Sequence, residues 1–332
     1  MENPLLSVRN LTLDIPVGGG TLHAVRGIDF DLMRGETLCI VGESGSGKSL
    51  TSLALMGLLG KTIRRSADRM DFDGTDILTA KPRAMRALRG DRMAMIFQEP
   101  MTSLNPAYTI GDQLTEALLL HKSVGREAAR ERAVELLEKV GITAARSRLG
   151  QYPHQLSGGL RQRVMIAMAL MCEPELIIAD EPTTALDVTI QAQILRLLYD
   201  LGREMNMAMI LITHDLGVVA RVADKVAVMY AGELVETGPA ADVFNTPSHP
   251  YTRGLLRCIP QPGKTERGST LGTIPGIVPS LIGEVEGCAF RTRCSHARPE
   301  CRAEIPHRKE GEHAFRCIHP DGARHAEEEV SA

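Results

Sequence analysis

The sequence predicts an α/β protein, and three observations lead to that fold class. Short apolar runs that are typical of buried strands alternate with longer segments of helix-forming residues. A glycine-rich loop joins one such run to an apolar helix within residues 40–59. After about residue 240 the chain becomes rich in proline, glycine and polar residues, which indicates the start of a second, smaller part.

The first part of the chain is expected to begin with strands. Residues 5–41 alternate β-branched and polar residues, which predicts short antiparallel strands that lead into a buried strand at 38–41. Residues 48–59 are apolar and helical, and residues 93–97 form another buried strand. Residues 109–140 combine helix spacing with helix-forming residues and a closing glycine, which predicts a helical insert.

Two further apolar runs, 175–180 and 208–213, predict parallel strands with a helix between them. Residues 225–238 are expected to form a closing hairpin. We therefore place a core domain at residues 1–240, with its helical insert at about 100–165. A small cysteine-rich extension with a disordered tail is expected at residues 241–332.

Composition and charge limit the class of protein. The 332 residues carry a net charge of −3, with 43% hydrophobic and 24% charged residues, which is ordinary for a globular protein. Lysine and arginine form no long block, so no nucleic-acid partner is expected. No apolar run reaches the ~20 residues that cross a bilayer, and the amino terminus lacks the layout of a signal peptide. We expect a cytosolic chain that can dock on a membrane protein.

The loop at residues 42–49 has the composition of a phosphate-binding site. Its spacing, G-x-x-x-x-G-K-S, lies between a predicted strand and a predicted helix, as such a loop requires. Glycines let the backbone N–H groups point at phosphate oxygens, and the helix adds its positive amino-terminal end. Lys48 is expected to reach the β- and γ-phosphates, and Ser49 to ligate Mg²⁺. The residues expected to bind nucleotide here are Gly42, Glu43, Ser44, Gly45, Ser46, Gly47, Lys48, Ser49 and Leu50. This loop alone leaves kinases, GTPases, helicases and transporter ATPases open.

Two other segments narrow the choice. Asp180 ends an apolar run and Glu181 follows it. A carboxylate at the tip of a buried strand beside the phosphate loop can hold Mg²⁺, and the next one can polarise a water molecule. Ser157, Gly158 and Gly159 open a predicted helix, whose amino terminus offers a second anion site.

These segments resemble those of an ABC transporter nucleotide-binding subunit, and they follow one another along the chain in the order that is typical of this family. "GESGSGKS" resembles its Walker A motif, "LSGGLRQR" its signature and "LIIADE" its Walker B motif. Asp187 in "TALD" fits the D-loop, Gln98 in "IFQEP" the Q-loop and His214 in "LITHD" the switch histidine. The resemblance implies a P-loop NTPase cassette with a RecA-like core, an antiparallel β subdomain and a helical insert.

The resemblance also implies a mechanism in which two cassettes pair head to tail with ATP and Mg²⁺ between them. Lys48 and the loop amides would hold the phosphates, while Ser49, Gln98 and Asp180 would organise Mg²⁺. Glu181 would be the general base and His214 would contact the γ-phosphate. The residues that would complete the nucleotide sites at the interface are Ser157, Gly158, Gly159 and Asp187. The implied catalytic residues are Glu181, His214, Lys48 and Gln98.

One feature departs from the family pattern. The family stacks adenine on an aromatic residue some two dozen positions before the phosphate loop, and the region from Asp14 to His23 contains none. Ile15 or His23 is expected to pack there instead.

Three segments outside the shared motifs resemble the oligopeptide/dipeptide branch of peptide/nickel-type importers: residues 97–113, 248–256 and the cysteine-bearing end. This resemblance implies an ATPase that powers import of di- or oligopeptides from the cytoplasmic face of the inner membrane. Its implied partners are a second, similar ATPase subunit in a heterodimer, two permease subunits and an extracytoplasmic peptide-binding protein.

Several alternatives stay open at this point. An importer of the same family could carry glutathione, nickel or another solute. A soluble ABC ATPase of DNA repair or translation usually has a long coiled coil, a zinc insertion or two cassettes. A regulatory module that senses ATP without sustained hydrolysis does not need Glu181 and His214, which are both present.

The segment from Gln98 to about Ile110 is the expected coupling surface toward the permeases. Leu104→Asp or Tyr108→Asp is therefore expected to uncouple transport from ATP hydrolysis.

Four cysteines near the end of the chain suggest a metal site. Their gaps are five, six and fifteen residues for Cys288, Cys294, Cys301 and Cys317. Four thiolates can hold a 4Fe-4S cluster or a structural Zn²⁺, and the absence of C-x₂-C pairs favours the cluster. The resemblance implies such a cluster in at least some members, with a structural role. Free thiols are the remaining alternative, and mixed ligation could involve His296, His307, His313 or His319.

Overall fold

The fold was analysed in a computed structural model of the chain. The described residues are 3–98, 103–183, 187–259, 272–279, 281–283 and 285–320. The expected disordered tail lies outside these ranges, as does part of the expected coupling surface, residues 99–102.

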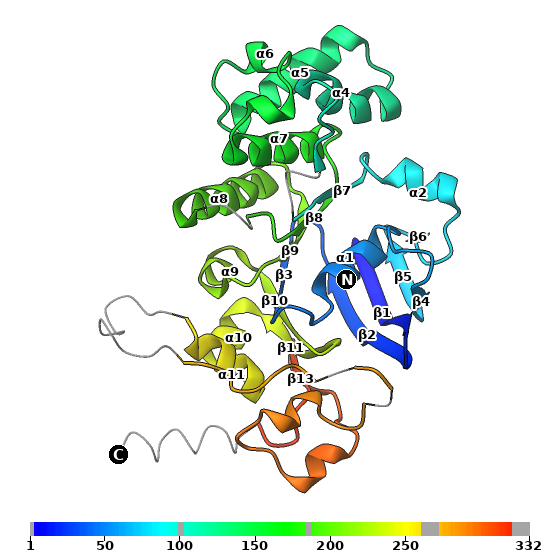
Figure 1. The fold of residues 1–332 in the computed structure, drawn as a ribbon, viewed down its shortest axis with the longest axis vertical. Helices are drawn as coiled ribbons and strands as arrows, with labels where there is room; N and C mark the ends of the chain where they lie inside the picture. The colour runs from blue at the N-terminus through cyan, green and yellow to red at the C-terminus, as the bar shows by residue number, and fades with distance from the viewer. Residues whose placement is uncertain are drawn as a thin grey trace.

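A central sheet of eight strands carries the core (Figure 1). Its five parallel strands are neighbours in the order β10, β3, β9, β8 and β7. Every residue of β3, β8 and β9 is buried, as expected for parallel strands that are covered on both faces. The parallel pairing predicted for 175–180 and 208–213 is therefore confirmed. The bounds are β10 Lys225–Tyr230, β3 Thr37–Val41, β9 Ala208–Ile212, β8 Leu176–Asp180 and β7 Met93–Ile96.

A second sheet packs beside the first and is antiparallel throughout. The sequence predicted short strands here, but β1 and β2 are 12 and 13 residues long. The register of β1 against β2 shifts at several irregular positions, where the alternation of residue types is interrupted. Both strands continue through these positions instead of ending there. The bounds are β1 Leu6–Val17, β2 Gly20–Leu32, β4 Arg64–Ser66, β5 Arg69–Phe72 and β6 Thr75–Asp76.

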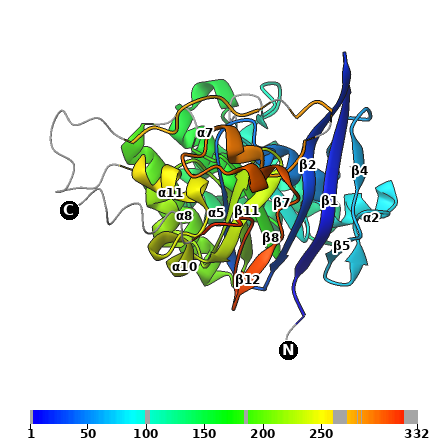
Figure 2. The same ribbon diagram turned by 90° about the horizontal axis from the view of Figure 1, so that it is seen from below.

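Helices cover the central sheet. Helix α1 follows the phosphate loop. Helix α8 lies on the other side of the sheet from β1 and β2 in both views, and α9 lies on that side in Figure 1 (Figures 1 and 2). Helix α1 ends earlier than predicted, at Leu55, because Gly57 adopts a φ of 60°. The bounds are α1 Lys48–Leu55, α2 Pro82–Leu88, α8 Val188–Glu204 and α9 Leu216–Val222.

The predicted helical insert forms the upper part of Figure 1. Its helices α4, α5 and α7 pack against one another through apolar faces. The interhelical core includes Leu114 of α4, Leu137 of α5 and Ile166 of α7, all fully buried. The bounds are α4 Ile110–His121, α5 Arg126–Lys139, α6 Ala145–Arg148, the 3₁₀ turn η1 Pro153–Gln155 and α7 Gly158–Leu170.

The carboxyl-terminal part is joined to the same central sheet. Strand β11 pairs with β10 in the predicted hairpin, and β13 then pairs with β11. This edge extension was not predicted, because its two strands are only three residues long. The bounds are β11 Glu233–Pro239, α10 Ala240–Asn245, α11 Pro250–Arg257, η2 Ala289–Thr292, η3 Pro299–Arg302, β12 Arg308–Glu310 and β13 His313–Phe315.

A buried carboxylate ties this part together. Glu236 of β11 is fully buried and accepts hydrogen bonds from the backbone N–H groups of Ser248 and His249, at 2.6 and 2.9 Å. Its Oε1 also lies 2.7 Å from Nε2 of His313 in β13, and this contact raises the pKa of His313. Burial lowers the pKa of His249 to about 4, so this ring is neutral near pH 7. Residues 248 and 249, within the segment 248–256, are therefore fixed to the central sheet through Glu236.

Within the described ranges, no helix has both the length and the apolar character that crossing a bilayer requires.

Candidate nucleotide-binding site

Four neighbouring parallel strands deliver the predicted site residues at their carboxyl ends. Gly42 follows β3, Gln98 lies just beyond β7, Glu181 follows β8, and His214 lies just beyond β9. Open α/β sheets bind ligands at this edge, because the loops that leave the strands converge there. The sheet order therefore brings together segments that are far apart in the sequence.

The phosphate loop requires glycine at two positions. Gly42 has a φ of 151°, and a Cβ atom there would collide with the carbonyl oxygen of Met229. Gly47 has a φ of 105°, and a Cβ atom would lie 2.6 Å from the carbonyl oxygen of Ala24. These contacts press the loop against β10 and β2, so the glycines serve close packing as well as chain reversal. Ser44 and Gly45 are exposed at the loop tip.

Lys48 lies inside the loop that precedes it. Its side chain is buried, and Nζ donates to the carbonyl oxygens of Gly42 and Glu43 at 2.8 and 2.9 Å. Desolvation lowers the pKa of Lys48, and nearby carboxylates oppose that shift. Nζ also donates to Oγ of Ser46 at 3.5 Å, so the loop curls around the ammonium group that is expected to reach the phosphates.

Asp180 faces the first turn of α1. Its Oδ1 accepts from Ser49 Oγ at 2.9 Å, and its Oδ2 accepts from Ser52 Oγ at 3.4 Å. Burial raises the pKa of Asp180 above its usual value. A buried carboxylate beside a serine hydroxyl is a donor set that suits Mg²⁺, so the residues present fit this ion. Ser52 was missed by the sequence prediction, although it lies three residues after Ser49 on the same helix face.

Glu181 is held in an unusual backbone conformation. Its φ is 44°, and its N–H donates to the carbonyl oxygen of Ile212 in β9 at 2.9 Å. Non-glycine residues in this region are costly and concentrate at functional sites. Gln98 Nε2 donates to Glu181 Oε2 at 3.2 Å, and His214 Nδ1 lies 3.6 Å from the same oxygen. The structure therefore brings these three predicted catalytic side chains together.

The signature and D-loop residues are arranged differently. Ser157 Oγ accepts from the N–H of Leu160 at 3.4 Å and caps α7, and Gly158 beside it is exposed. Asp187 Oδ1 accepts from the N–H of Ile190 at 3.0 Å and caps α8, and it is also exposed. Gly159 lies against Ile190. These residues lie on the surface, in a position to meet another molecule.

Two functional contacts of the phosphate loop were not predicted from the sequence. The backbone N–H of Glu43 donates to the hydroxyl of Tyr251, at 2.9 Å. The carboxylate of Glu43 pairs with Arg293. Tyr251 lies within a segment singled out for resemblance, but nothing local in the sequence indicates that either residue reaches a loop more than 200 positions away.

The expected substitutes for an adenine-stacking aromatic lie on the antiparallel sheet. His23 Nδ1 is 2.7 Å from Oδ1 of Asp14, and both side chains are partly exposed. Ile15, between them in the sequence, is half-buried.

The four predicted ligand cysteines line one cavity in the carboxyl-terminal part. His296 and His319 also line it, and Nε2 of His319 is buried without a hydrogen-bond partner. Burial raises the pKa of Cys288 to about 11, so a cation would be needed to stabilise its thiolate. This thiol-rich lining fits thiolate-bound iron or zinc chemically. In the described part of the chain, however, no three metal-ligating side chains form a coordination sphere.

The structure corrects two details of the sequence prediction. His313 hydrogen-bonds Glu236, which makes it a poor candidate for mixed ligation. Leu104 is 2% exposed and belongs to the apolar core, so it does not form part of a coupling surface. The sequence around it has no helix or strand periodicity, so it gave no sign of this burial. Tyr108, by contrast, is 56% exposed.

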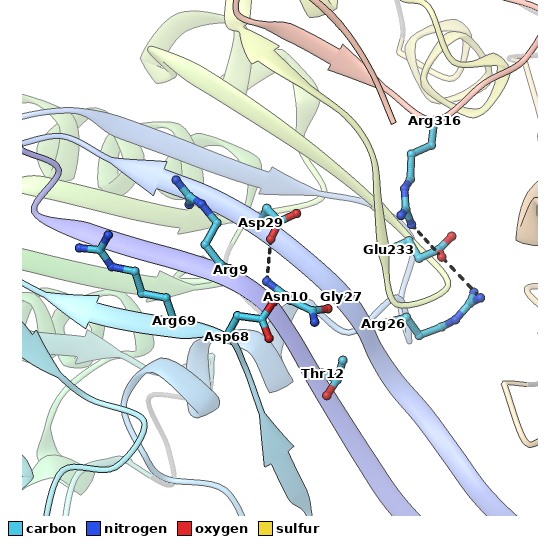
Figure 3. Close-up of a pocket in the computed structure, with 10 residues that line it drawn as sticks. All are labelled: Arg9, Asn10, Thr12, Arg26, Gly27, Asp29, Asp68, Arg69, Glu233 and Arg316. Atoms are coloured by element: carbon cyan, nitrogen blue, oxygen red, sulfur yellow. Dashed lines mark hydrogen bonds and ion pairs between the residues drawn. The ribbon is translucent and has the colours of Figure 1, made fainter. Parts of the chain in front are cut away.

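A wide cavity with charged walls lies at the edge of the antiparallel sheet (Figure 3). Glu233 accepts from Arg316 Nη1 at 2.9 Å, and Arg26 Nη2 lies 3.4 Å from the same carboxylate. These contacts join the residue after β13 to β11 and β2 (Figure 3). They anchor the carboxyl-terminal part to both sheets.

Comparisons with known proteins show the families and the solved structures that this chain resembles. The ABC transporter family matches residues 25–184, and the family described as "Oligopeptide/dipeptide transporter, C-terminal region" matches residues 235–301. Among solved structures, the dimeric bacterial ABC transporter cassette MJ0796 superposes with a TM-score of 0.63 at 28% identity, over 71% of this chain and 98% of that one. CbiO1 of Clostridium perfringens gives 0.62 at 29% identity, over 74% and 92%.

Curated relatives match over nearly the full length. The dipeptide transport ATP-binding protein DppD of Bacillus subtilis is 52% identical, over 91% of this chain and 90% of its own. DppD of Escherichia coli is 50% identical over 91% and 92%, and the oligopeptide transport ATP-binding protein OppD of Salmonella typhimurium is 52% identical over 92% and 90%. The predicted α/β cassette is confirmed, and the chain belongs to the ABC transporter family of ATPases, in the branch of the oligopeptide/dipeptide transport ATP-binding proteins.

Proposed function

We propose that this chain hydrolyses ATP to power the import of di- or oligopeptides through a membrane permease. The proposal rests on the match of this chain to both the ABC transporter family and the oligopeptide/dipeptide C-terminal family. It is supported by the candidate nucleotide-binding site at the carboxyl ends of β3, β7, β8 and β9. Relatives with about half of their residues identical are named as dipeptide or oligopeptide transport proteins. None of these names points to DNA repair or translation.

The geometry supports a division of labour among the site residues. Lys48 and the loop amides would hold the β- and γ-phosphates, and Ser49, Gln98 and Asp180 would hold Mg²⁺, which would offset phosphate charge. Glu181, which directly follows β8, would accept the proton of the attacking water, and Gln98 and His214 lie beside its carboxylate. His214 lies 3.6 Å from the same carboxylate and is exposed, which supports a contact with the γ-phosphate.

The exposed amino terminus of the signature helix supports a paired arrangement. Ser157 and Gly158 lie on the surface at the start of α7, where a helix amino terminus can bind an anion. MJ0796 is dimeric, and one of its structures holds ADP and Pi. We therefore place ATP between the phosphate loop of one cassette and Ser157, Gly158, Gly159 and Asp187 of another. The partner is a second, similar ATPase subunit in a heterodimer.

The complete importer then adds two permease subunits and an extracytoplasmic peptide-binding protein, with this chain at the cytoplasmic face of the inner membrane. Co-purification with neighbouring permeases, followed by ATPase assays over a peptide panel, tests this assignment. Stimulation by di- or oligopeptides in the presence of the binding protein is the expected result. ATPase activity that is stimulated only by glutathione, nickel or another solute would show that the transported substrate is not a peptide. ATPase activity that no permease stimulates would contradict a role in transport.

The surface around Tyr108 is expected to transmit closure of the cassettes to the permeases. Tyr108→Asp places a charge on a large exposed ring, so peptide uptake should fall at least about fivefold while the ATPase activity of the isolated subunit stays unchanged. Ile277→Asp, at a residue that is 89% exposed outside the insert, is the matched control. Equal uptake by the two variants would contradict a coupling role for Tyr108.

We propose further that the four cysteines bind a 4Fe-4S cluster, with Zn²⁺ as the alternative. The shared cavity and the unpartnered Nε2 of His319 support a bound group there. Protein purified anaerobically is expected to be brown, with absorbance near ~400 nm and about four iron atoms per chain. Cys301→Ser should lower the iron content. A colourless protein with stoichiometric zinc would favour the alternative, and one without either metal would exclude both.

A further inference from the structure

The phosphate loop is held by the carboxyl-terminal part at one residue, Glu43. Arg293 Nη1 and Nη2 donate to its two carboxylate oxygens at 2.6 and 2.9 Å, which is a bidentate pair. Tyr251 accepts the backbone N–H of the same residue. Arg293 directly precedes Cys294, so the cysteine-bearing segment and the nucleotide site are joined by one ion pair.

The guanidinium of Arg293 is fixed in place by its surroundings. The side chain is only 4% exposed. Nε and Nη2 donate to the carbonyl oxygens of Pro275 and Ile274, at 2.9 and 3.0 Å. The group also lies over the rings of Tyr230 and Phe290, 5.8 and 6.0 Å from their centroids. A buried arginine that is held on every side can impose its position on Glu43.

The charge of Glu43 explains why such a partner is needed. The side chain stands in a loop that receives a polyanion, and its carboxylate is close enough to Lys48 to influence the pKa of that ammonium. An unpaired carboxylate there would repel the triphosphate and compete for Lys48. Arg293 cancels this charge with a cation that cannot lose its proton.

We propose that Arg293 is a positioning residue through which the carboxyl-terminal part completes the nucleotide site, by neutralising Glu43 and fixing the phosphate loop. This inference rests on the proposed ATPase function. It implies that ATP affinity depends on the fold of the cysteine-bearing segment, which the family's shared cassette motifs do not include.

A double-mutant cycle tests the inference. Arg293→Met removes the charge and keeps the length, so KM for ATP and the Kd for a fluorescent ATP analogue should rise about tenfold. That is the effect of one unit charge about 10 Å from another at an effective dielectric constant of about 20. The kcat at saturating ATP should change less than twofold. In a Glu43→Gln background the same substitution should change KM less than twofold, because no carboxylate is left to neutralise.

Three comparisons make the result decisive. Arg298→Met, an exposed arginine of the same segment, should leave KM unchanged. Arg293→Lys should recover part of the affinity. An equal rise of KM in both Glu43 backgrounds, or a fall of kcat alone, would show a merely structural role and overturn the inference. Failure of the wild-type protein to bind ATP would instead overturn the proposed function.

Discussion

Glu181→Gln is expected to lower kcat for ATP hydrolysis by a factor of about 10²–10⁴, while ATP binding is retained. The amide has the shape of the carboxylate and can still meet Gln98, but it cannot take a proton from water. The left-handed backbone of Glu181 and its bond to β9 do not depend on the side-chain charge, so the fold should be unchanged.

Steady-state ATPase rates and equilibrium binding of an ATP analogue measure this effect separately. Glu204→Gln is the matched control, because Glu204 is exposed and pairs only with Lys139 among the contacts described. A kcat within about threefold of the wild type would contradict the role of Glu181 as general base. The loss of ATP binding together with activity would show that the substitution damages the loop.

Lys48→Ala is expected to weaken ATP binding about a hundredfold. A hydrogen bond to a charged group contributes about 1.5–3 kcal/mol, and each 1.4 kcal/mol corresponds to a factor of about ten in affinity. Lys48 also satisfies the carbonyl oxygens of Gly42 and Glu43, so its removal loosens the loop that supplies the other phosphate contacts.

Titration of a fluorescent ATP analogue measures this loss directly. Lys61→Ala, which removes an exposed lysine just beyond α1, should bind ATP as the wild type does. Equal affinities for the two variants would exclude Lys48 from phosphate binding and would place the nucleotide elsewhere.

The sequence predicted the strands, helices and loops whose structure depends on residues that are neighbours in the chain. The apolar runs that became β3, β8 and β9 are buried along their whole length, and the helices of the insert follow helix periodicity. The phosphate loop was predictable because strand, glycines, lysine and helix are contiguous in the chain. Asp180 was predictable because an apolar run ends on it.

The remaining features depend on contacts between distant residues. Arg293 and Glu43 are 250 positions apart, and no periodicity relates them. Strand β13 is three residues long and exists because β11 offers a free edge. Leu104 lies in an irregular segment, where sequence gives no face to assign, and only packing against the insert shows that it is buried.

Uptake of a labelled dipeptide into proteoliposomes tests the central claim most directly. The vesicles contain the two permeases and both ATPase subunits, with ATP on the side of this chain and the binding protein on the other. The account predicts ATP-dependent accumulation that Glu181→Gln in this chain reduces at least about tenfold. Accumulation that needs no ATP, or that is unaffected by this substitution, would contradict it.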